Sequence, residues 1–374
     1  MPAAQRQLAL DDARDLIGQI GFGGDPGDGL IGVELESFAV PATDPASLAL
    51  PVLPGGSAIS FEPGGQVELS SRPARSVGEV CEAVGLDLAV LREAFSRQGI
   101  ELVQRGLSRS VPRRIVDGPR YRAMEAYFDA GGPAGRVMMC ATASVQVNVD
   151  LGPGPERWRR ANALGPVLAA AFSSSALPRR WACARLGAWL EVDPTRTAPV
   201  EPEPEPGAAW ADYALDARVM LIRADPEDYV PVVEPLTARE WVAGGHPLGW
   251  PTSEDVAYHL TTLFPPVRPR GWLEVRMIDA LPDPWWRVPV AVVAAVLDDP
   301  DVEAQCGSAA VLAPDGWRAA AVRGLADPVL AEGAAACAKT ALAGLDRVDA
   351  DPLTADLVDR WASAVFEGRK LPWT

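Results

Sequence analysis

Polar and apolar side chains alternate in four short segments of this chain. The segments are GVELE (32–36), FEPGGQVELS (61–70), SVQVNVD (144–150) and WLEVR (272–276). In a β-strand, residues two apart point to the same face of the sheet. Leucine and valine fill the positions between the polar ones, which suits a packed face. The pattern therefore predicts strands that each have one apolar and one polar face.

Hydrophobic spacing elsewhere predicts further strands and many helices. Strands are expected at 30–37, 57–71 (two strands around a turn), 100–106, 137–150, 183–192, 217–223 and 271–278, with the clearest alternation at 137–150. Helices are expected at 5–20, 76–98, about 119–131, 156–175, 236–243, 253–264, 286–298, through much of 315–346, and at 353–367. Because the two kinds of element do not alternate regularly, a doubly wound parallel sheet is disfavoured. We expect an α+β fold, in which a largely antiparallel sheet forms a cup lined with polar residues and helices pack outside.

Breaks in this pattern suggest the domain organisation. The Gly-rich stretch GFGGDPGDG (21–29) ends the first helix. We expect residues 1–24 to form an N-terminal helix and connector, and residues 25–374 a single catalytic domain. The Pro/Glu tract at 199–206 is expected to be a surface loop. The N-terminus lacks a signal-peptide core, and the longest apolar run (290–297) is too short to cross a bilayer.

Composition excludes several classes of function. The 374 residues carry a formal net charge of -16, which argues against nucleic acid and anionic membranes as partners. The chain has two lysines, two histidines and no GxxxxGK[ST] or GxSxG motif, so Walker-type, zinc and triad chemistry are disfavoured. The five cysteines form no CxxC pair and fit buried, reduced thiols. We expect a cytoplasmic monomer whose partners are small-molecule substrates.

The polar strand faces carry the candidate chemistry. Carboxylates that face each other repel unless a cation lies between them, and hard oxygen ligands suit Mg²⁺ or Mn²⁺. Taken singly, each acidic pair could be a solvated strand face, and the last pair could be an ion pair. Their recurrence on four strand-like segments favours a site for metal and phosphate. The residues that share these faces are Glu34, Glu36, Gln66, Glu68, Gln146, Asn148, Asp150, Glu274 and Arg276.

One arginine lies in an apolar stretch of the chain. Arg185 has Leu186 and Trp189 as close neighbours in the sequence RLGAWL. A buried guanidinium group needs an anion to pair with, and its fork geometry matches a carboxylate or phosphate. We therefore expect Arg185 to bind an anionic group of a substrate.

Five motifs together resemble the glutamate–cysteine ligases of the plant and bacterial type, and closely the actinobacterial branch that feeds ergothioneine synthesis. The motifs are EPGGQVELS (62–70), RYRAMEAYF…MMCATASVQVNVD (120–150), DPTRT (193–197), DYALD (212–216) and HLTTLFPPVR…WLEVRMID (259–279). The resemblance runs from about residue 30 to residue 299. It implies a cup similar in fold to glutamine synthetase, with ATP and Mg²⁺ (or Mn²⁺) inside. The implied reaction joins the γ-carboxyl group of L-glutamate to the amine of L-cysteine, releasing ADP and phosphate.

The resemblance also implies roles for individual residues. The implied metal ligands are Glu34, Glu36, Glu62, Glu68 and Glu274; the catalytic pair is Glu274 and Arg276, with Arg276 on phosphate; and the substrate-binding residues are Arg113, Arg114, Arg120, Tyr121, Gln146, Asn148, Arg185, Trp189 and Arg196. The choice between Arg113 and Arg114 stays open, and so does the role of Gln146. Leu186 departs from the family pattern, which has a serine at this position. A ligase for another acceptor amine and a catalytically silent binding protein remain alternatives.

Overall fold

The computed structural model describes residues 8–24, 27–201, 205–225, 228–302 and 315–374. Its centre is a 7-stranded sheet in the order β2-β3-β1-β5-β9-β8, with β4 paired to the end of β1. Every strand pairing in this sheet is antiparallel. The strands are β1 (Ile31–Val40), β2 (Ala58–Phe61), β3 (Val67–Ser70), β4 (Glu101–Val103), β5 (Ser144–Asp150), β8 (Val267–Pro269) and β9 (Trp272–Asp279). The expected α+β fold with an antiparallel sheet is confirmed.

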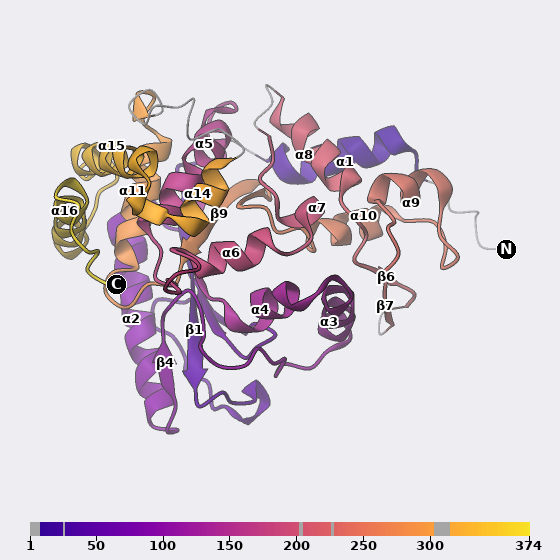
Figure 1. Cartoon of the computed structure of the whole chain (residues 1–374), viewed down its shortest axis with the longest axis horizontal. Helices are drawn as coiled ribbons and strands as arrows, with labels where there is room; N and C mark the ends of the chain where they lie inside the picture. The colour runs from indigo at the N-terminus through magenta and orange to yellow at the C-terminus, as the bar shows by residue number, and fades with distance from the viewer. Residues whose placement is uncertain (1–7, 25–26, 202–204, 226–227, 303–314) are drawn as a thin grey trace.

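The apolar positions of the alternating strands form the main core. Val33, Leu35, Val147 and Val275 are buried there, on the face opposite the polar side chains. Helices α2 (Val77–Ser96), α5 (Glu156–Ala171) and α11 (Arg287–Leu297) pack on the sheet. The C-terminal helices α14 (Asp315–Val322), α15 (Pro328–Gly344) and α16 (Pro352–Phe366) extend this layer, and Figure 1 shows them gathered around α11.

The polar face of the sheet is walled by a second group of helices. These are α3 (Pro119–Gly131), α4 (Pro133–Ala141) and α6 (Ala184–Leu190), followed by the short α7 (Pro194–Thr197). The α1 helix (Leu10–Phe22) packs against α8 (Pro206–Asp216), α9 (Ala238–Gly244) and α10 (Ser253–Leu260), at the upper right of Figure 1. A small hairpin, β6 (Leu221–Arg223) with β7 (Tyr229–Pro231), contacts α3. Two short 3-10 helices lie at Pro45–Ser47 and Gly324–Ala326.

The expected strand at 137–150 is wrong in its first half, which belongs to α4. Gly132 has φ 117°, a conformation that glycine adopts readily, and Pro133 stands in the first turn of the helix. Met138, Met139 and Cys140 in this helix then pack into a buried cluster. The strand begins only at Ser144, where valines alternate with polar residues. The tertiary packing of an apolar, alternating stretch therefore decided its structure.

The expected strand at 183–192 is also wrong, because residues 184–190 form α6. Arg185 and Trp189 are four residues apart, so a helical turn places them on one face. The guanidinium carbon of Arg185 lies 5.5 Å from the centre of the Trp189 ring. The stretch 315–346 contains two main helices, and the helix expected at 5–20 begins at Leu10, although residues 1–7 lie outside the described residues.

The remaining expectations concern the cysteines, the tract 199–206, membrane spans and the domain boundary. Four cysteines, Cys81, Cys140, Cys183 and Cys337, are buried as expected, whereas Cys306 lies outside the described residues. The tract 199–206 also falls partly on residues that the structure does not describe. None of the described helices combines the length and the apolar character needed to cross a membrane. The domain boundary at residues 24 and 25 stays a prediction.

Candidate active site

A cavity of about 400 Å³ lies over the polar face of the sheet. Its lining divides by charge. One wall carries four carboxylates, and the other carries arginines from α3, α6, β8 and β9 and the turn that follows β8. The carboxylates are Glu34, Glu36, Glu62 and Glu68, and the arginines are Arg120, Arg185, Arg268, Arg270 and Arg276. An acidic wall facing a basic wall can bind a cation and a polyanion side by side.

The strand register brings the carboxylates together. Glu36 on β1 is paired directly with Glu68 on β3, and Glu34 precedes Glu36 by two residues on the same face. Burial raises the pKa of Glu34 to about 7, and the charge of Glu68 adds to the rise. Burial likewise raises the pKa of Glu62 to about 8, with contributions from Glu68 and Glu36. Burial and like charge thus both oppose the ionised form of this wall.

Short polar side chains hold the carboxylates in place. Glu36 accepts hydrogen bonds from the backbone nitrogen and hydroxyl of Ser144, at 2.8 and 3.0 Å. Glu34 accepts one from Asn148 Nδ2 at 3.0 Å, and Glu68 accepts one from Ser60 Oγ at 2.7 Å. Each carboxylate keeps lone pairs that these bonds do not use. The wall is therefore oriented, and although the charge of Arg276 favours its ionised form, burial outweighs that effect.

The chemistry of this donor set fits a divalent cation. Among the described residues, no group of three acidic, histidine or cysteine side chains is already placed to hold a metal ion. Mg²⁺, however, is usually bound through one or two carboxylates together with water and substrate phosphates. Paired carboxylates with raised pKa values, such as Glu34 with the neighbouring Glu68, suit this mode of binding. A cation here would also relieve the repulsion within the wall.

The basic wall is organised around a single buried carboxylate. Glu274 is only 1% exposed and forms ion pairs with Arg268 at 2.6 Å, Arg270 at 2.8 Å and Arg276 at 3.3 Å. Burial opposes its ionisation, but the charges of Arg268 and Arg276 outweigh that effect and lower the pKa of Glu274 to about 2. Glu274 does not line the cavity with the other four carboxylates. In this structure it is the anchor of three arginines, in line with the ion-pair alternative for this segment.

Several buried donors beside the cavity have no acceptor within the described part of the chain. They are Nε of Arg185, Nε of Arg276 and Nε1 of Trp189. Arg185 is otherwise held by a bond from its Nη2 to the carbonyl oxygen of Arg276, at 2.9 Å. Leaving a buried N–H group unsatisfied is unfavourable. These donors therefore suit an anionic group that enters from the cavity.

The structure brings some predicted residues to the cavity and leaves others outside it. Tyr121, Gln146 and Trp189 line it, and so does Arg120, which Thr261 anchors through bonds of 2.9 and 3.0 Å. Asn148 reaches the site only through its bond to Glu34. Asp150 accepts a bond from the Leu30 backbone at 2.7 Å and holds the start of β1.

Three predicted substrate arginines do not line the cavity. Arg196 is fully buried, pairs with Asp193 at 3.0 Å and donates to the carbonyl oxygen of Thr262 at 2.8 Å. It therefore ties α7 to the segment before β8. Arg114 pairs with Glu125 at 3.0 Å and with Asp117, and Arg113 is exposed. The structure accordingly supports neither Arg113 nor Arg114 as a residue of the cavity wall.

Sequence reasoning missed Arg268 and Arg270. Both lie in PVRPRGWLE, where they alternate with Pro269 directly before the strand that carries Glu274. The register of the β8–β9 hairpin pairs Arg268 with Glu274. The signal was available, because R-x-R before a glycine turn predicts two arginines on one face of a hairpin.

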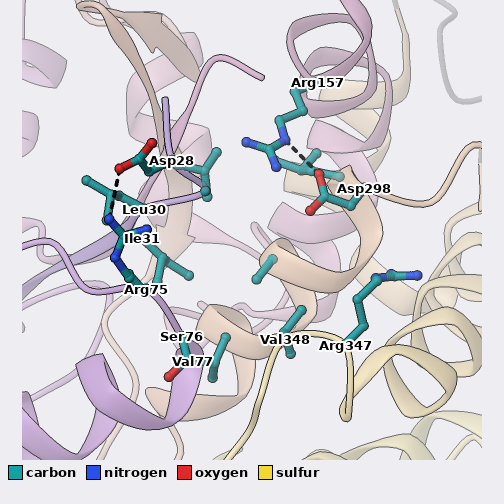
Figure 2. Close-up of a pocket in the computed structure, with 14 residues that line it drawn as sticks. Asp28, Leu30, Ile31, Arg75, Ser76, Val77, Arg157, Asp298, Arg347 and Val348 are labelled. Carbon is teal, nitrogen blue, oxygen red and sulfur yellow. Dashed lines mark hydrogen bonds and ion pairs between the residues drawn. The ribbon is translucent and has the colours of Figure 1, made fainter. Parts of the chain in front are cut away.

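A second cavity, of about 250 Å³, does not match the predicted chemistry. It lies where the start of β1 meets the end of α11, and its walls include Leu30, Val77 and Leu297. Figure 2 shows two ion pairs among its charged groups, Arg75 with Asp28 at 2.8 Å and Arg157 with Asp298 at 2.6 Å, while Arg347 donates to the carbonyl oxygen of Ala295 at 2.8 Å. None of the residues expected to act in catalysis lines it. Charge and motif content therefore place the candidate site in the larger cavity.

Comparisons with known proteins agree with the motifs. The family model described as Glutamate-cysteine ligase family 2 (GCS2) matches residues 30–357. Glutamate–cysteine ligase EgtA of Mycolicibacterium smegmatis is 40% identical over 338 residues, covering 84% of this chain and 79% of the relative. The chloroplastic glutamate–cysteine ligase of Arabidopsis thaliana is 31% identical over 269 residues, covering 67% of this chain and 51% of the plant protein.

Among solved structures, a bifunctional glutathione synthetase from Pasteurella multocida matches with a TM-score of 0.48 and 13% identity, covering 97% of this chain and 49% of that chain. This likeness is too low to add to the sequence comparisons. The family match spans most of the chain and includes every residue of both cavity walls. The chain belongs to glutamate–cysteine ligase family 2.

Proposed function

We propose that this chain is an ATP-dependent ligase that joins the γ-carboxyl group of L-glutamate to the amine of L-cysteine. The products are γ-glutamylcysteine, ADP and phosphate. The observation that carries the proposal is the 40% identity to a glutamate–cysteine ligase over 84% of the chain. A cavity that sets four carboxylates against five arginines supports it, because the reaction needs cations and phosphate groups close together.

The chemistry requires activation of a carboxylate. A free amine does not displace oxygen from a carboxylate at neutral pH, so the γ-carboxylate of glutamate first attacks the γ-phosphorus of ATP and ADP leaves. The amine of cysteine then attacks the carbonyl carbon of the acyl phosphate, loses a proton and expels phosphate. Both steps gather the negative charges of the phosphates and a carboxylate in one place. The protein's main task is therefore electrostatic stabilisation and positioning.

The two walls divide this task. In the proposal, Glu34, Glu36, Glu62 and Glu68 hold the divalent cations. Mg²⁺ bound there would neutralise phosphate charge and align donor with acceptor, and Mn²⁺ shares the same preference for oxygen ligands. Glu274 joins this set only if it leaves its arginines, so we propose that it acts mainly by orienting them.

Arginines on the opposite wall face the phosphates in this proposal. Arg276 stabilises the transferring phosphoryl group, while Arg268 and Arg270 bind the rest of the triphosphate. Loss of one such preorganised charge typically costs on the order of 10²–10³ in rate. Arg185, Trp189 and the neighbouring residues Arg120 and Tyr121 are assigned to the amino-acid substrates, because they line the same cavity.

A coupled assay for ADP release tests the proposal. We expect release only when ATP, Mg²⁺, glutamate and cysteine are all present, with equal amounts of ADP and γ-glutamylcysteine. Release with another amine but not with cysteine would identify a different ligase. Absence of ADP and phosphate release with every amine in a panel would show a catalytically silent relative and overturn the proposal.

The setting of the reaction is part of the same proposal. The resemblance to the actinobacterial branch favours a role in the supply of γ-glutamylcysteine for ergothioneine. We further propose that the protein works in the cytoplasm as a monomer. Light scattering during size-exclusion chromatography would check the second point, because a dimer would double the 39.6 kDa mass of the chain.

A further inference from the structure

We infer that the second cavity, between the start of β1 and the end of α11, is a regulatory site that binds a free α-amino acid with an apolar side chain. The site lies outside the catalytic cavity, and its ligand is not one of the substrates of the proposed reaction. Charge at the border, apolar surface inside, and two strands shared with the acidic wall all support it.

Charged groups of both signs border the cavity. The pair of Arg75 with Asp28 lies on one side and the pair of Arg157 with Asp298 on the other, and Figure 2 shows the two pairs facing each other across the space between them. Arg347 donates to a backbone carbonyl oxygen at 2.8 Å, and its guanidinium group points away from that space. A phosphate group would meet both aspartates as well as the arginines. A zwitterion, with one charge of each sign, complements this border.

Arg157 offers an open edge to a carboxylate. Its side chain is 18% exposed, its Nε donates to Asp298 Oδ1 at 2.6 Å, and its Nη1 donates to the carbonyl oxygen of Asp150 at 2.9 Å. Its Nη2 has no partner within the described part of the chain. A guanidinium group held by two bonds can still donate a third to a carboxylate, while Asp298 Oδ2 can accept from an ammonium group. Both charges of an amino acid thus have a partner at one ion pair.

The interior of the cavity is apolar. Its apolar lining residues are Leu30, Ile31, Val77, Val149, Ala294, Leu297 and Val348. A cavity of about 150 Å³ is large enough for benzene. The volume of about 250 Å³ therefore has room for an amino acid of the size of leucine. It is smaller than the roughly 300–1,000 Å³ typical of sites for drug-sized ligands, so a nucleotide does not fit.

The floor of this cavity is the back of the acidic wall. Ile31 on β1 is paired with Val149 on β5, and both residues line the cavity. The next pair along, Gly32 with Asn148, faces the other side of the sheet, where Asn148 donates to Glu34 at 3.0 Å. The two cavities therefore lie on opposite faces of one pair of strands.

Hydrogen bonds connect the border of the cavity to the same strands. Arg157 donates to the carbonyl oxygen of Asp150 at the end of β5, and the carboxylate of Asp150 accepts from the backbone nitrogen of Leu30 before β1 at 2.7 Å. A ligand on Arg157 thus acts on both strands that position Glu34. It favours the conformation described, in which the cavity is open and Glu34 faces its neighbours.

This arrangement links the amino acid to the divalent cation, and the link rests on the proposed metal site. Two ligands that favour the same conformation raise the affinity for each other by the same factor. We expect the amino acid to lower the apparent Kd for Mg²⁺ by about 5-fold, the lower end of the usual range for coupled sites.

Calorimetric titration of the full-length protein with L-leucine tests the site. Glutamate, Mg²⁺ and a non-hydrolysable ATP analogue are present at saturation, so that the catalytic cavity is occupied. We expect one leucine per chain, with a Kd below about 10 mM. Leucinamide lacks the carboxylate and 4-methylpentanoate lacks the ammonium group. Each should bind about 10-fold more weakly or worse, because each loses a hydrogen bond between charged groups.

Two variants locate the binding. Ala294→Phe fills the cavity from α11 without removing a charge and should abolish leucine binding. Ala94→Phe on α2 is the matched control, because Ala94 is also a half-buried helical alanine but lies outside both cavities. It should bind leucine as the wild type does. Arg157→Gln removes the guanidinium fork and should weaken binding by about 10-fold.

The outcomes separate binding from regulation. Leucine binding that persists in folded Ala294→Phe, or equal binding of leucine and its two analogues, would overturn the site. If Ala294→Phe does not fold, unchanged binding in Arg157→Gln would do so. Leucine that binds without changing the apparent Kd for Mg²⁺ would overturn the regulatory role. A wild type that binds leucine but releases no ADP with glutamate and cysteine would instead refute the proposed function.

Discussion

At the scale of single residues, two buried glutamates have opposite electrostatic surroundings. Glu68 lies among other carboxylates, and burial together with the charge of Glu36 raises its pKa. Glu274 lies among arginines, and its pKa is lowered to about 2. The same residue type therefore destabilises the metal-free fold at one position and stabilises it at the other. Spacing in the sequence does not distinguish the two glutamates. It shows which face of a strand a carboxylate occupies, but it does not show which charged groups lie opposite that carboxylate.

This contrast gives a prediction about stability. Glu274→Gln leaves three arginines without their anion and should destabilise the metal-free protein by about 3–5 kcal/mol, the typical cost of breaking a buried ion pair from one side. Glu68→Gln removes a repelling charge and should be neutral or stabilising. Chemical denaturation in EDTA measures both. Both variants should lose ADP release by about 10² or more. Equal destabilisation by the two substitutions would show that the walls are not electrostatically distinct.

At the scale of elements, α6 and the β8–β9 hairpin carry the groups that complete the site. A single turn of α6 places Arg185 and Trp189 side by side on the cavity wall. The hairpin places Arg268 directly opposite Glu274. The sequence predicted the four strands with a polar face, but it also predicted strand over the second half of α4 and where α6 lies. The failure has a physical cause, because a short apolar run suits a buried helix as well as a buried strand.

The helix supplies the next prediction. Arg185→Lys keeps the charge on α6 but loses the planar fork that can bind a carboxylate through two bonds. We expect the KM for an amino-acid substrate to rise by about 10-fold or more, with a smaller change in kcat. Arg92→Lys, on the remote helix α2, is the control and should leave both constants unchanged. A change confined to the KM for ATP would contradict the assignment of Arg185 to an amino acid.

At the scale of the whole molecule, the acidic wall links folding to pH and to metal. The pKa of Glu34 is about 7 and that of Glu62 about 8, against 4.5 for the free side chain. Between about pH 4.5 and pH 8 the folded protein therefore binds more protons than the unfolded chain. Its free energy of unfolding falls as the pH rises through this range. His259 acts in the opposite direction below pH 6.5, because burial lowers its pKa to about 4. This opposing contribution fades above pH 6.5, so the glutamates dominate between pH 6.5 and pH 8.

The whole-molecule prediction follows from this sign. In EDTA, the Tm should fall by about 1–2 °C between pH 6.5 and pH 8, because about 1 kcal/mol of stability shifts the Tm of a 374-residue chain only slightly. Mg²⁺ at pH 8 should reverse the fall, because a cation stabilises the ionised carboxylates. The double variant Glu34→Gln/Glu62→Gln should flatten the pH dependence and abolish the response to Mg²⁺. Thermal unfolding measures all of these values, and a Tm that rises with pH in EDTA would count against the carboxylate wall.

The sequence by itself determined the strands with one polar face, the antiparallel α+β class and the family. The strands and the fold class follow from local periodicity, and the family follows from the motifs. Both kinds of signal can be read from the sequence without knowing the fold. Only the tertiary structure decided that Glu274 anchors arginines, that Arg196 is buried outside the cavity, and that Arg75 and Arg157 border one second cavity. These facts depend on which segments, distant in the sequence, contact each other in the fold. Burial and charge pairing among residues far apart in the chain determine those contacts.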